Sequence, residues 1–523
     1  MLGGAFARNF AGERARPPSV LAAMTTKSDG APNGGYSLTK ETALIGLGCH
    51  KSMWWRVHEP MALELAPSLA DDFRRREGRR VGELARSYVP GGRLIVGGPA
   101  DDPAARVSAT LDMLRDASVP AVYEGAFLAN DTLVRTDILE RRGGAWTLIE
   151  VKSATSVSAA EHLPDLAIQA AVVRASGLPV DRYEIMHLNR ECRFPDLSNL
   201  FVRADATEQV RSMLDAVDLA IVEAVRAARE TAAPEAVIGD HCSKPRDCAF
   251  KDRCWPALPK HHVRTLYRIG RKANALIEQG YETIDQLPDD VKLGAVAARQ
   301  RRAVRQGSIV VERDELVRAL AAVERPVAHL DFETVGPAIP RWSGCRPYDQ
   351  VPVQLSCHVV GVDGTTTHHE WLFDGDGDPR PDAARAILAA CRAAKTVTAY
   401  YSSFEKQCIE LVAAACPDDA GELRRIAASL VDLLPIVREH VYHPDFCGSF
   451  SLKSVLPALV PEMTYQGLEI AEGGAAQVQL SRLLFETDMN EAERREIRGA
   501  LLRYCKLDTN AMVALERKLL ALV

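Results

Sequence analysis

The chain has 523 residues, of which 47% are hydrophobic and 26% are charged. These proportions are typical of globular proteins, and the length predicts two to four domains. The formal net charge of −6 excludes a uniformly basic nucleic-acid coat, so any phosphate-binding surface has to be local. No apolar run approaches the roughly 18 residues of a membrane helix and no signal peptide opens the sequence, which predicts a cytoplasmic protein without a membrane partner.

The beginning of the chain changes character near residue 40. Residues 1–40 are rich in Ala, Gly, Pro, Ser and Arg without helical or strand periodicity, a composition that predicts a disordered tail. The stretch ALIGLGCHKSMWWRV follows, and it predicts that Cys49 lies at the start of a helix. The neighbouring pair Trp54 and Trp55 would shield a cofactor held there.

The twelve cysteines predict metal ligands and buried thiols rather than a disulfide framework, because the expected compartment is reducing. Three of them are evenly spaced in HCSKPRDCAFKDRCW: Cys242, Cys248 and Cys254. Three thiolates close a tetrahedral zinc site with a histidine such as His241, or hold an iron–sulfur cluster with one more cysteine. We favour the cluster, with Cys49 as the distant ligand and Cys192, in a predicted strand, as the weaker candidate.

A β-hairpin is predicted in LVRTDILERRGGAWTLIEVKSA, where Arg-Arg-Gly-Gly separates two alternating apolar runs. Glu150 and Lys152 are two residues apart on the second strand and therefore project from one face. Asp137 lies on the first strand. An Asp and a Glu on adjacent strands hold Mg²⁺, and a neighbouring Lys steadies the water nucleophile or the charge on a phosphate. Without Asp137, the pair would be read as a surface ion pair.

These residues, the following helix EHLPDLAIQAAVV with His162, Asp165 and Gln169, and the enclosing cysteines resemble the RecB-type PD-(D/E)XK nucleases with an iron–sulfur cluster. The resemblance spans residues 41–256 and implies a restriction-endonuclease-like fold. It implies metal binding by Asp137 and Glu150. It also makes Lys152 catalytic and gives Gln169 a supporting role. The ligands of the implied 4Fe-4S cluster are Cys49, Cys242, Cys248 and Cys254. In one departure, Gly82 stands where many of these nucleases carry a histidine.

Residues 257–325 predict a helical linker. The stretch RTLYRIGRKANALIEQGYETIDQLP has helical spacing, then Gly-Tyr, then a second helix start. Between residues 256 and 310 there are ten Lys or Arg against five Asp or Glu. A helix-hairpin-helix module that presents backbone N–H groups to phosphate is therefore the alternative interpretation.

Residues 326–523 contain a second ordered set of acids. In RPVAHLDFETVG, alternation places Asp331 and Glu333 on one strand face, where they repel each other unless a cation lies between them. Downstream, TVTAYYSSFEKQCIEL predicts a helix start at Glu405. The next stretch supplies Asp432 and a Ser-Leu-Lys helix start. In IRGALLRYCKLDTNAMVAL, Tyr504 and Asp508 are one helical turn apart.

This set resembles the DnaQ-like DEDD exonucleases of the ribonuclease H-like fold, in the variant with Tyr in the final motif. The resemblance implies that Asp331, Glu333 and Asp508 bind two metal ions, Mg²⁺ or Mn²⁺. It places Glu405 at the usual Asp position of the second motif. Tyr504 would orient the attacking water.

The two resemblances in this order are similar to a bacterial family of unassigned function that joins both domains, with the stretches DFET, RPYDQVPVQLS and HCSKPRDCAFKDRCW. The predicted fold class is therefore α/β throughout. The implied function is a metal-dependent nuclease acting on nucleic acid, on single-stranded DNA or DNA ends rather than RNA. The sequence has no Walker loop, so a helicase would be a separate chain. The alternative is a scaffold that binds nucleic-acid ends without cutting them.

Overall fold

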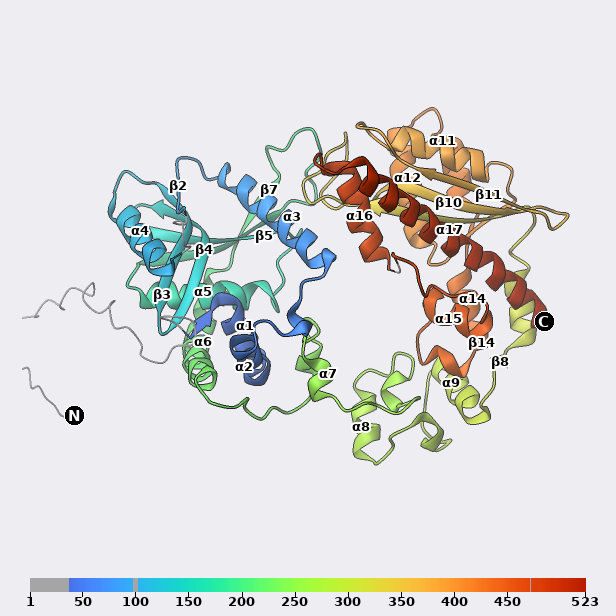
Figure 1. The fold of residues 1–523 in the computed structure, drawn as a ribbon, viewed down its shortest axis with the longest axis horizontal. Coiled ribbons are helices and arrows are strands. Elements are labelled where there is room, and N and C mark those ends of the chain that lie inside the picture. Colours follow the sequence, from blue (N-terminus) through green and yellow to red (C-terminus); the bar gives the residue numbers. More distant parts are fainter. Residues whose placement is uncertain (1–36, 97–101, 471) are drawn as a thin grey trace, which may run out of the picture. The chain divides into compact units, whose positions relative to one another are not determined.

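The computed structural model describes residues 37–96, 102–470 and 472–523. The predicted tail lies outside the described residues up to residue 36, and its last residues form strand β1 (Leu38–Thr39) and the start of helix α1 (Lys40–Gly48). The chain divides into two compact units of mixed α/β structure (Figure 1). Unit 1 consists of Met1–Ala66, Gly82–His187 and Phe201–Lys251, and unit 2 of Pro67–Val81, Leu188–Leu200 and Asp252–Val523.

Unit 1 is built on a seven-stranded sheet of order β2-β3-β4-β5-β6-β7, with β1 paired in parallel to β4. The strands are β2 (Arg93–Leu94), β3 (Ala121–Ala129), β4 (Thr132–Arg142), β5 (Ala145–Lys152), β6 (Val180–Leu188) and β7 (Phe201–Asp205). The predicted hairpin is confirmed, because β4 and β5 are antiparallel. Gly143 in their turn has a φ of 61°, which glycine adopts without strain.

Helix α5 (His162–Ala175), predicted from its sequence, fills the core of unit 1. Its residues from Asp165 to Val173 are all buried, because it packs against both the sheet and α6 (Thr207–Ala228). Unit 1 also contains the helices α2 (His50–His58), η2 (Leu63–Leu65), α4 (Pro103–Arg115) and η3 (Asp240–Cys242), where η marks a 3-10 helix. Most of α3 (Leu69–Arg86) and of α7 (Lys251–Cys254) belongs to unit 2.

Unit 2 is built on a five-stranded sheet of order β11-β10-β9-β12-β13. The strands are β9 (Val327–Val335), β10 (Val351–Val360), β11 (Thr366–Leu372), β12 (Thr396–Ala399) and β13 (Leu430–Asp432). The central strand β9 is antiparallel to β10 and parallel to β12. The helices of this part are α11 (Arg380–Cys391), α12 (Ser403–Ala415), α13 (Ala420–Ala428), α14 (Leu433–His440), η6 (Pro444–Phe446), α15 (Leu452–Leu459), α16 (Gly473–Phe485) and α17 (Glu491–Ala521).

Alternation along β9 divides its side chains between two covered faces. Leu330 and Phe332 join the apolar cluster under α11, α12 and α13. Val335 packs on the other face against α16 and α17, and Figure 1 shows α17 running across the sheet. Asp331 and Glu333 share the face of Val335, so they point toward α17.

The segment expected as a linker, 257–325, is a packed part of unit 2. Its elements are η4 (Val263–Thr265), α8 (Lys272–Glu278), η5 (Ile284–Gln286), α9 (Ala295–Gln306), β8 (Val310–Val311) and α10 (Arg313–Leu320), and β8 pairs with β14 (Val441–Tyr442). The second helix start expected after Gly280 is present but short: the chain forms only the three-residue 3-10 helix η5, because Pro288 lies two residues beyond its end and prevents extension.

Much of the positive charge of this segment is used internally. Arg299 is buried and donates to the Arg438 carbonyl at 3.0 Å, Arg301 donates to the Pro288 carbonyl at 2.6 Å, and Arg302 and Arg305 pair with acids. These four arginines therefore stabilise the segment itself. None of the described helices is long and apolar enough to span a bilayer.

Candidate metal centres

In unit 2, three acids that are distant in sequence meet at one point. Asp331 and Glu333 project from β9 and Asp508 projects from α17. One oxygen of each carboxylate lies within 4.8 Å of the other two. Within residues 37–96, 102–470 and 472–523, this is the only group of three or more His, Cys, Asp or Glu residues with such spacing. The alternation predicted for β9 and the helical spacing of α17 explain the convergence.

These carboxylates are partly buried and repel one another. Burial, followed by the charge of Asp508, raises the pKa of Glu333 to about 8. Burial and then the charges of Asp508 and Glu333 raise the pKa of Asp331 well above its ordinary value. A cation between such groups removes the repulsion, and an all-oxygen donor set suits Mg²⁺ or Mn²⁺. The residues therefore fit a divalent ion.

Glu405 belongs to the same electrostatic cluster. It lies in the first turn of α12, as predicted, and its side chain is buried. Burial and, to a smaller extent, Asp432 raise its pKa to about 8, and its charge adds to the raised pKa of Asp331. Its Oε2 atom has no hydrogen-bond partner among the described residues. An unused oxygen on a buried acid adds a donor position for a cation.

Asp432 positions this helix. Its carboxylate accepts hydrogen bonds from Tyr401 N at 2.9 Å and Ser402 N at 3.0 Å, just before α12 begins. Tyr401 has a φ of 78°, in the left-handed region that is strained for a residue with a side chain. The two bonds hold the loop in this conformation and thereby fix the start of α12 and the position of Glu405.

Two tyrosines and a lysine surround Asp508. Tyr465 donates its hydroxyl to Asp508 Oδ1 at 2.6 Å, and Tyr504 lies one turn before Asp508 on α17. Lys453, in the first turn of α15, donates to Tyr504 Oη at 3.3 Å and lies over both tyrosine rings. Its charge opposes the burial that raises the pKa of Glu333. The sequence indicated the Ser-Leu-Lys helix start without a role for Lys453, and it gave no signal for Tyr465.

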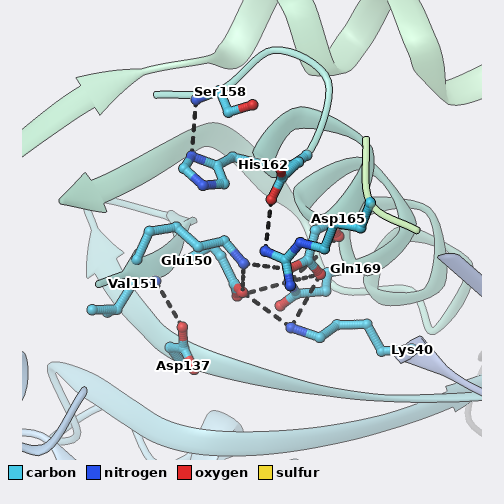
Figure 2. A network of polar contacts seen from close by, with 11 residues as sticks. Lys40, Asp137, Glu150, Val151, Ser158, His162, Asp165 and Gln169 are labelled. Atoms are coloured by element: carbon cyan, nitrogen blue, oxygen red, sulfur yellow. Dashed lines mark hydrogen bonds and ion pairs between the residues drawn. The ribbon is translucent and has the colours of Figure 1, made fainter. Parts of the chain in front are cut away.

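In the acidic centre of unit 1, lysine side chains of the protein contact the carboxylates directly (Figure 2). Lys152 Nζ donates to Glu150 Oε1 at 2.8 Å and also contacts Asp165. Lys40 Nζ lies 3.0 Å from the same Glu150 oxygen and 3.1 Å from Asp165 Oδ1. Gln169 Nε2 donates to Glu150 Oε2 at 2.7 Å. Both oxygens of Glu150 therefore have partners.

Asp137 lies beside this network on β4, where its Oδ2 accepts a hydrogen bond from Val151 N at 2.7 Å. Burial and then the charge of Glu150 raise the pKa of Asp137 well above its ordinary value. Burial on its own would also raise the pKa of Glu150, but the charges of Lys40 and Lys152 outweigh burial and lower it.

The four residues predicted for the unit 1 centre, Asp137, Glu150, Lys152 and Gln169, lie together, and Lys40 and Asp165 also belong to the centre. Asp165 stood in the predicted helix motif without a role, and Lys40 was missed because its contact with Glu150 spans 110 positions of sequence. At Gly82, an added Cβ would meet no atom within 4 Å, so the position has room for the first atom of a side chain.

Three of the four predicted cluster ligands are brought together in unit 1. Cys49 caps α2, and its Sγ accepts a hydrogen bond from Ser52 N at 3.4 Å. Cys248 Sγ donates to Ser52 Oγ at 3.3 Å, and Cys248 N donates to the Cys242 carbonyl at 2.9 Å. Cys254 ends α7, in the part of the chain that belongs to unit 2.

No three of these thiols and His241 have ligand atoms as close together as one zinc ion would require. Ligands at about 2.3 Å around one tetrahedral zinc lie about 3.8 Å from one another. His241 Nε2 lies 3.6 Å from Cys242 Sγ, yet no Cys or His trio of the described residues has all its ligand atoms within 4.8 Å. Thiolates of a four-iron cluster bind different irons and so lie farther apart.

The prediction that Cys192 lies in a strand is wrong. Cys192 lies in the loop between β6 and β7, because Pro195 and the turn at Asp196 interrupt the pairing. It is buried, and its Sγ donates to the Asp196 carbonyl at 3.5 Å. It belongs to unit 2.

The comparisons with known proteins add one family. Residues 328–451, less than half of the chain, match a family described as a domain of unknown function, DUF2779. The matched segment contains Asp331, Glu333 and Glu405, while Tyr504 and Asp508 lie beyond it. No curated protein matches the chain.

Proposed function

We propose that this protein is a metal-dependent nuclease with two hydrolytic centres that acts on single-stranded DNA or on DNA ends. The observation that carries the proposal is the meeting of Asp331, Glu333 and Asp508 at one point of unit 2. Three carboxylates that meet in a largely desolvated position destabilise a fold unless a cation joins them, so a metal site explains their convergence.

For unit 2 we propose a ribonuclease H-like fold and a DnaQ-like 3′–5′ exonuclease. The central position of β9, with helices on both faces of its sheet, supports this assignment. Asp331, Glu333 and Asp508 would hold Mg²⁺ or Mn²⁺, with Glu405 in the second motif. When bound, such ions lower the pKa of water and stabilise a departing 3′ oxygen.

The residues around Asp508 position the nucleophile in this proposal. Burial and then the charge of Asp508 raise the pKa of Tyr504, so the phenol stays protonated. Tyr504 Oη accepts a hydrogen bond from Lys453 Nζ, which leaves the phenolic hydrogen to be donated. Tyr504 would therefore orient the attacking water by hydrogen bonding and would not act as a base.

For unit 1 we propose a RecB-type PD-(D/E)XK nuclease with a 4Fe-4S cluster. Asp137 and Glu150, on the adjacent strands β4 and β5, would bind the metal. Lys152 would steady the water or the phosphate, and Gln169 fixes the Glu150 carboxylate through its hydrogen bond. The unpartnered Gln169 Oε1 is a further buried oxygen at this centre. The cluster ligands would be Cys49, Cys242, Cys248 and Cys254.

A second candidate function applies to unit 1. Because Glu150 is already engaged by two lysines and a glutamine, unit 1 is also consistent with a module that binds nucleic-acid ends without cutting them. In both cases we place the protein in the cytoplasm, with any helicase supplied by a separate chain.

Nuclease assays of the full-length protein test the proposal. Labelled single- and double-stranded DNA and RNA are incubated with Mg²⁺ or Mn²⁺. Asp331→Asn is expected to reduce 3′ trimming by about 10²–10³-fold, whereas Lys152→Met should remove only the other activity. The matched control is Glu410→Gln on α12, because this half-exposed acid pairs with Arg424 at 3.3 Å. If the wild-type protein binds these substrates but degrades none of them, the nuclease proposal is wrong and the end-binding scaffold is the remaining function.

A further inference from the structure

Lys40 holds a position in the unit 1 centre that the proposed function leaves unexplained. It is the first residue of α1, and β1 immediately before it pairs with β4. Its Nζ lies 3.0 Å from Glu150 Oε1 and 3.1 Å from Asp165 Oδ1. In Figure 2 its side chain extends toward these two carboxylates.

Glu150 Oε1 contacts two ammonium groups at once. Lys152 Nζ lies 2.8 Å from it and also contacts Asp165, so two lysines and two carboxylates alternate around the centre. The other oxygen of Glu150 accepts the hydrogen bond from Gln169. A cation that binds Glu150 therefore has to replace a partner supplied by the chain.

The two lysines that contact Glu150 differ in the element that carries them and in the exposed fraction of their side chains. Lys152 lies on the same strand face as Glu150, two residues away, and its side chain is 19% exposed. Lys40 comes from a separate element, α1, and its side chain is 29% exposed. Asp137, the second proposed ligand, has no ion pair among the described residues, although Lys40 interacts with it electrostatically.

We propose that the Lys40 ammonium group substitutes for a divalent cation at the unit 1 centre and leaves Glu150 when that centre binds one. Lys40 would thus set the metal affinity of unit 1 without being a ligand. In the metal-free protein, it neutralises carboxylates that would otherwise repel one another. The inference rests on the proposed metal site of unit 1.

Mn²⁺ binding to the full-length protein, followed by electron paramagnetic resonance of the free ion, tests the inference. Every variant carries Asp331→Asn and Asp508→Asn, so that unit 2 does not contribute. Lys40→Met keeps the length of the side chain and removes its charge. It is expected to tighten Mn²⁺ binding by about tenfold, because the ion no longer has to break a contact between unit charges 3.0 Å apart, and that contact is worth about this factor even in water. Unchanged or weaker binding overturns the inference.

Three matched variants complete the test. Lys40→Arg keeps the charge and is expected to bind Mn²⁺ as the parent does; tightening equal to that of Lys40→Met would overturn the inference. Glu150→Gln, added to Lys40→Met, is expected to abolish the gained affinity, and its persistence would place the gained site elsewhere. If circular dichroism shows that Lys40→Met is unfolded, Lys40→Gln takes its place, with the same expected tightening.

The inference and the proposed function fail in different assays. Tighter Mn²⁺ binding by Lys40→Met, in a protein whose wild type cuts no DNA, would remove the nuclease proposal and keep the inference. If Lys40→Met and its parent bind Mn²⁺ equally, in a protein whose unit 1 cuts DNA, the inference is wrong and the nuclease proposal is kept.

Discussion

The two acidic centres contain similar residues but reach charge balance in opposite ways. In unit 1, Lys40 and Lys152 outweigh burial and lower the pKa of Glu150. In unit 2, burial and the charge of Asp508 raise the pKa of Glu333 to about 8. The first centre is neutralised by ammonium groups on its own ligand oxygens, whereas the second keeps acids that repel one another.

This difference teaches that a similar pattern of acids places carboxylates in both centres, whereas the neighbouring groups determine whether those carboxylates are neutralised. In unit 2, Lys453 is hydrogen-bonded to the Tyr504 phenol, and its charge only partly opposes the burial that raises the pKa of Glu333. In unit 1, Lys40 contacts Glu150 Oε1 itself. We therefore expect unit 2 to bind Mg²⁺ or Mn²⁺ more tightly than unit 1.

Substitution of a predicted cluster cysteine should have the largest effect, and this effect should be on unit 1 and not on unit 2. Cys248→Ser should remove the iron of the proposed cluster, destabilise unit 1 and abolish its activity, because structural metal binding contributes directly to folding. Trimming by unit 2 should persist. Iron and labile sulfide are measured in the purified protein, where about four of each are expected. The control is Cys447→Ser, since Cys447 is exposed and lies in unit 2. A colourless protein with stoichiometric zinc would contradict the cluster.

The parts of both centres that follow from local periodicity were predictable from sequence. Alternation places Asp331 beside Glu333 and Glu150 beside Lys152, while the helical repeat places Tyr504 near Asp508. These relations depend on residues two to four positions apart. They hold wherever the strand or helix forms.

The parts that depend on distant chain segments were not predictable. Lys40 reaches Glu150 because two residues of β1 pair with β4, and so short a strand has no sequence signature. Tyr465 reaches Asp508 from the loop between α15 and α16, where no periodicity fixes its direction. The shortened helix at Ile284–Gln286 could have been read from Pro288, which limits the length available before it.

Lys453 tests whether a cation beside the acids of unit 2 behaves like Lys40. Lys453→Met should lower 3′ trimming by about tenfold, because Tyr504 loses the hydrogen bond that orients it. Mn²⁺ affinity should change by less than about threefold, since the lysine lies on the phenol. Lys453→Arg should recover most of the activity. If Lys453→Met instead tightens Mn²⁺ binding as much as Lys40→Met does, the contrast between the two lysines disappears.

The smallest effect is the pH dependence of stability that arises from Glu333 in unit 2. In EDTA, the pKa of Glu333 is about 8 against an ordinary value of 4.5. The folded protein therefore binds more protons than the unfolded chain between these values, so this group lowers stability as pH rises from about 4.5 to about 8. Glu333→Gln removes that penalty and should raise the melting temperature by about 2–6 °C at pH 9, with little change at pH 5.

The same measurement on unit 1 should have the opposite sign. Lys40 and Lys152 lower the pKa of Glu150, so this carboxylate stabilises the fold above its ordinary pKa, and Glu150→Gln should lower the melting temperature at pH 9. Glu410→Gln serves again as the control, because its half-exposed carboxylate should shift the temperature little at either pH. Shifts of equal sign for Glu333→Gln and Glu150→Gln would show that the two centres do not differ in resting charge balance, and the competition assigned to Lys40 would lose its electrostatic basis.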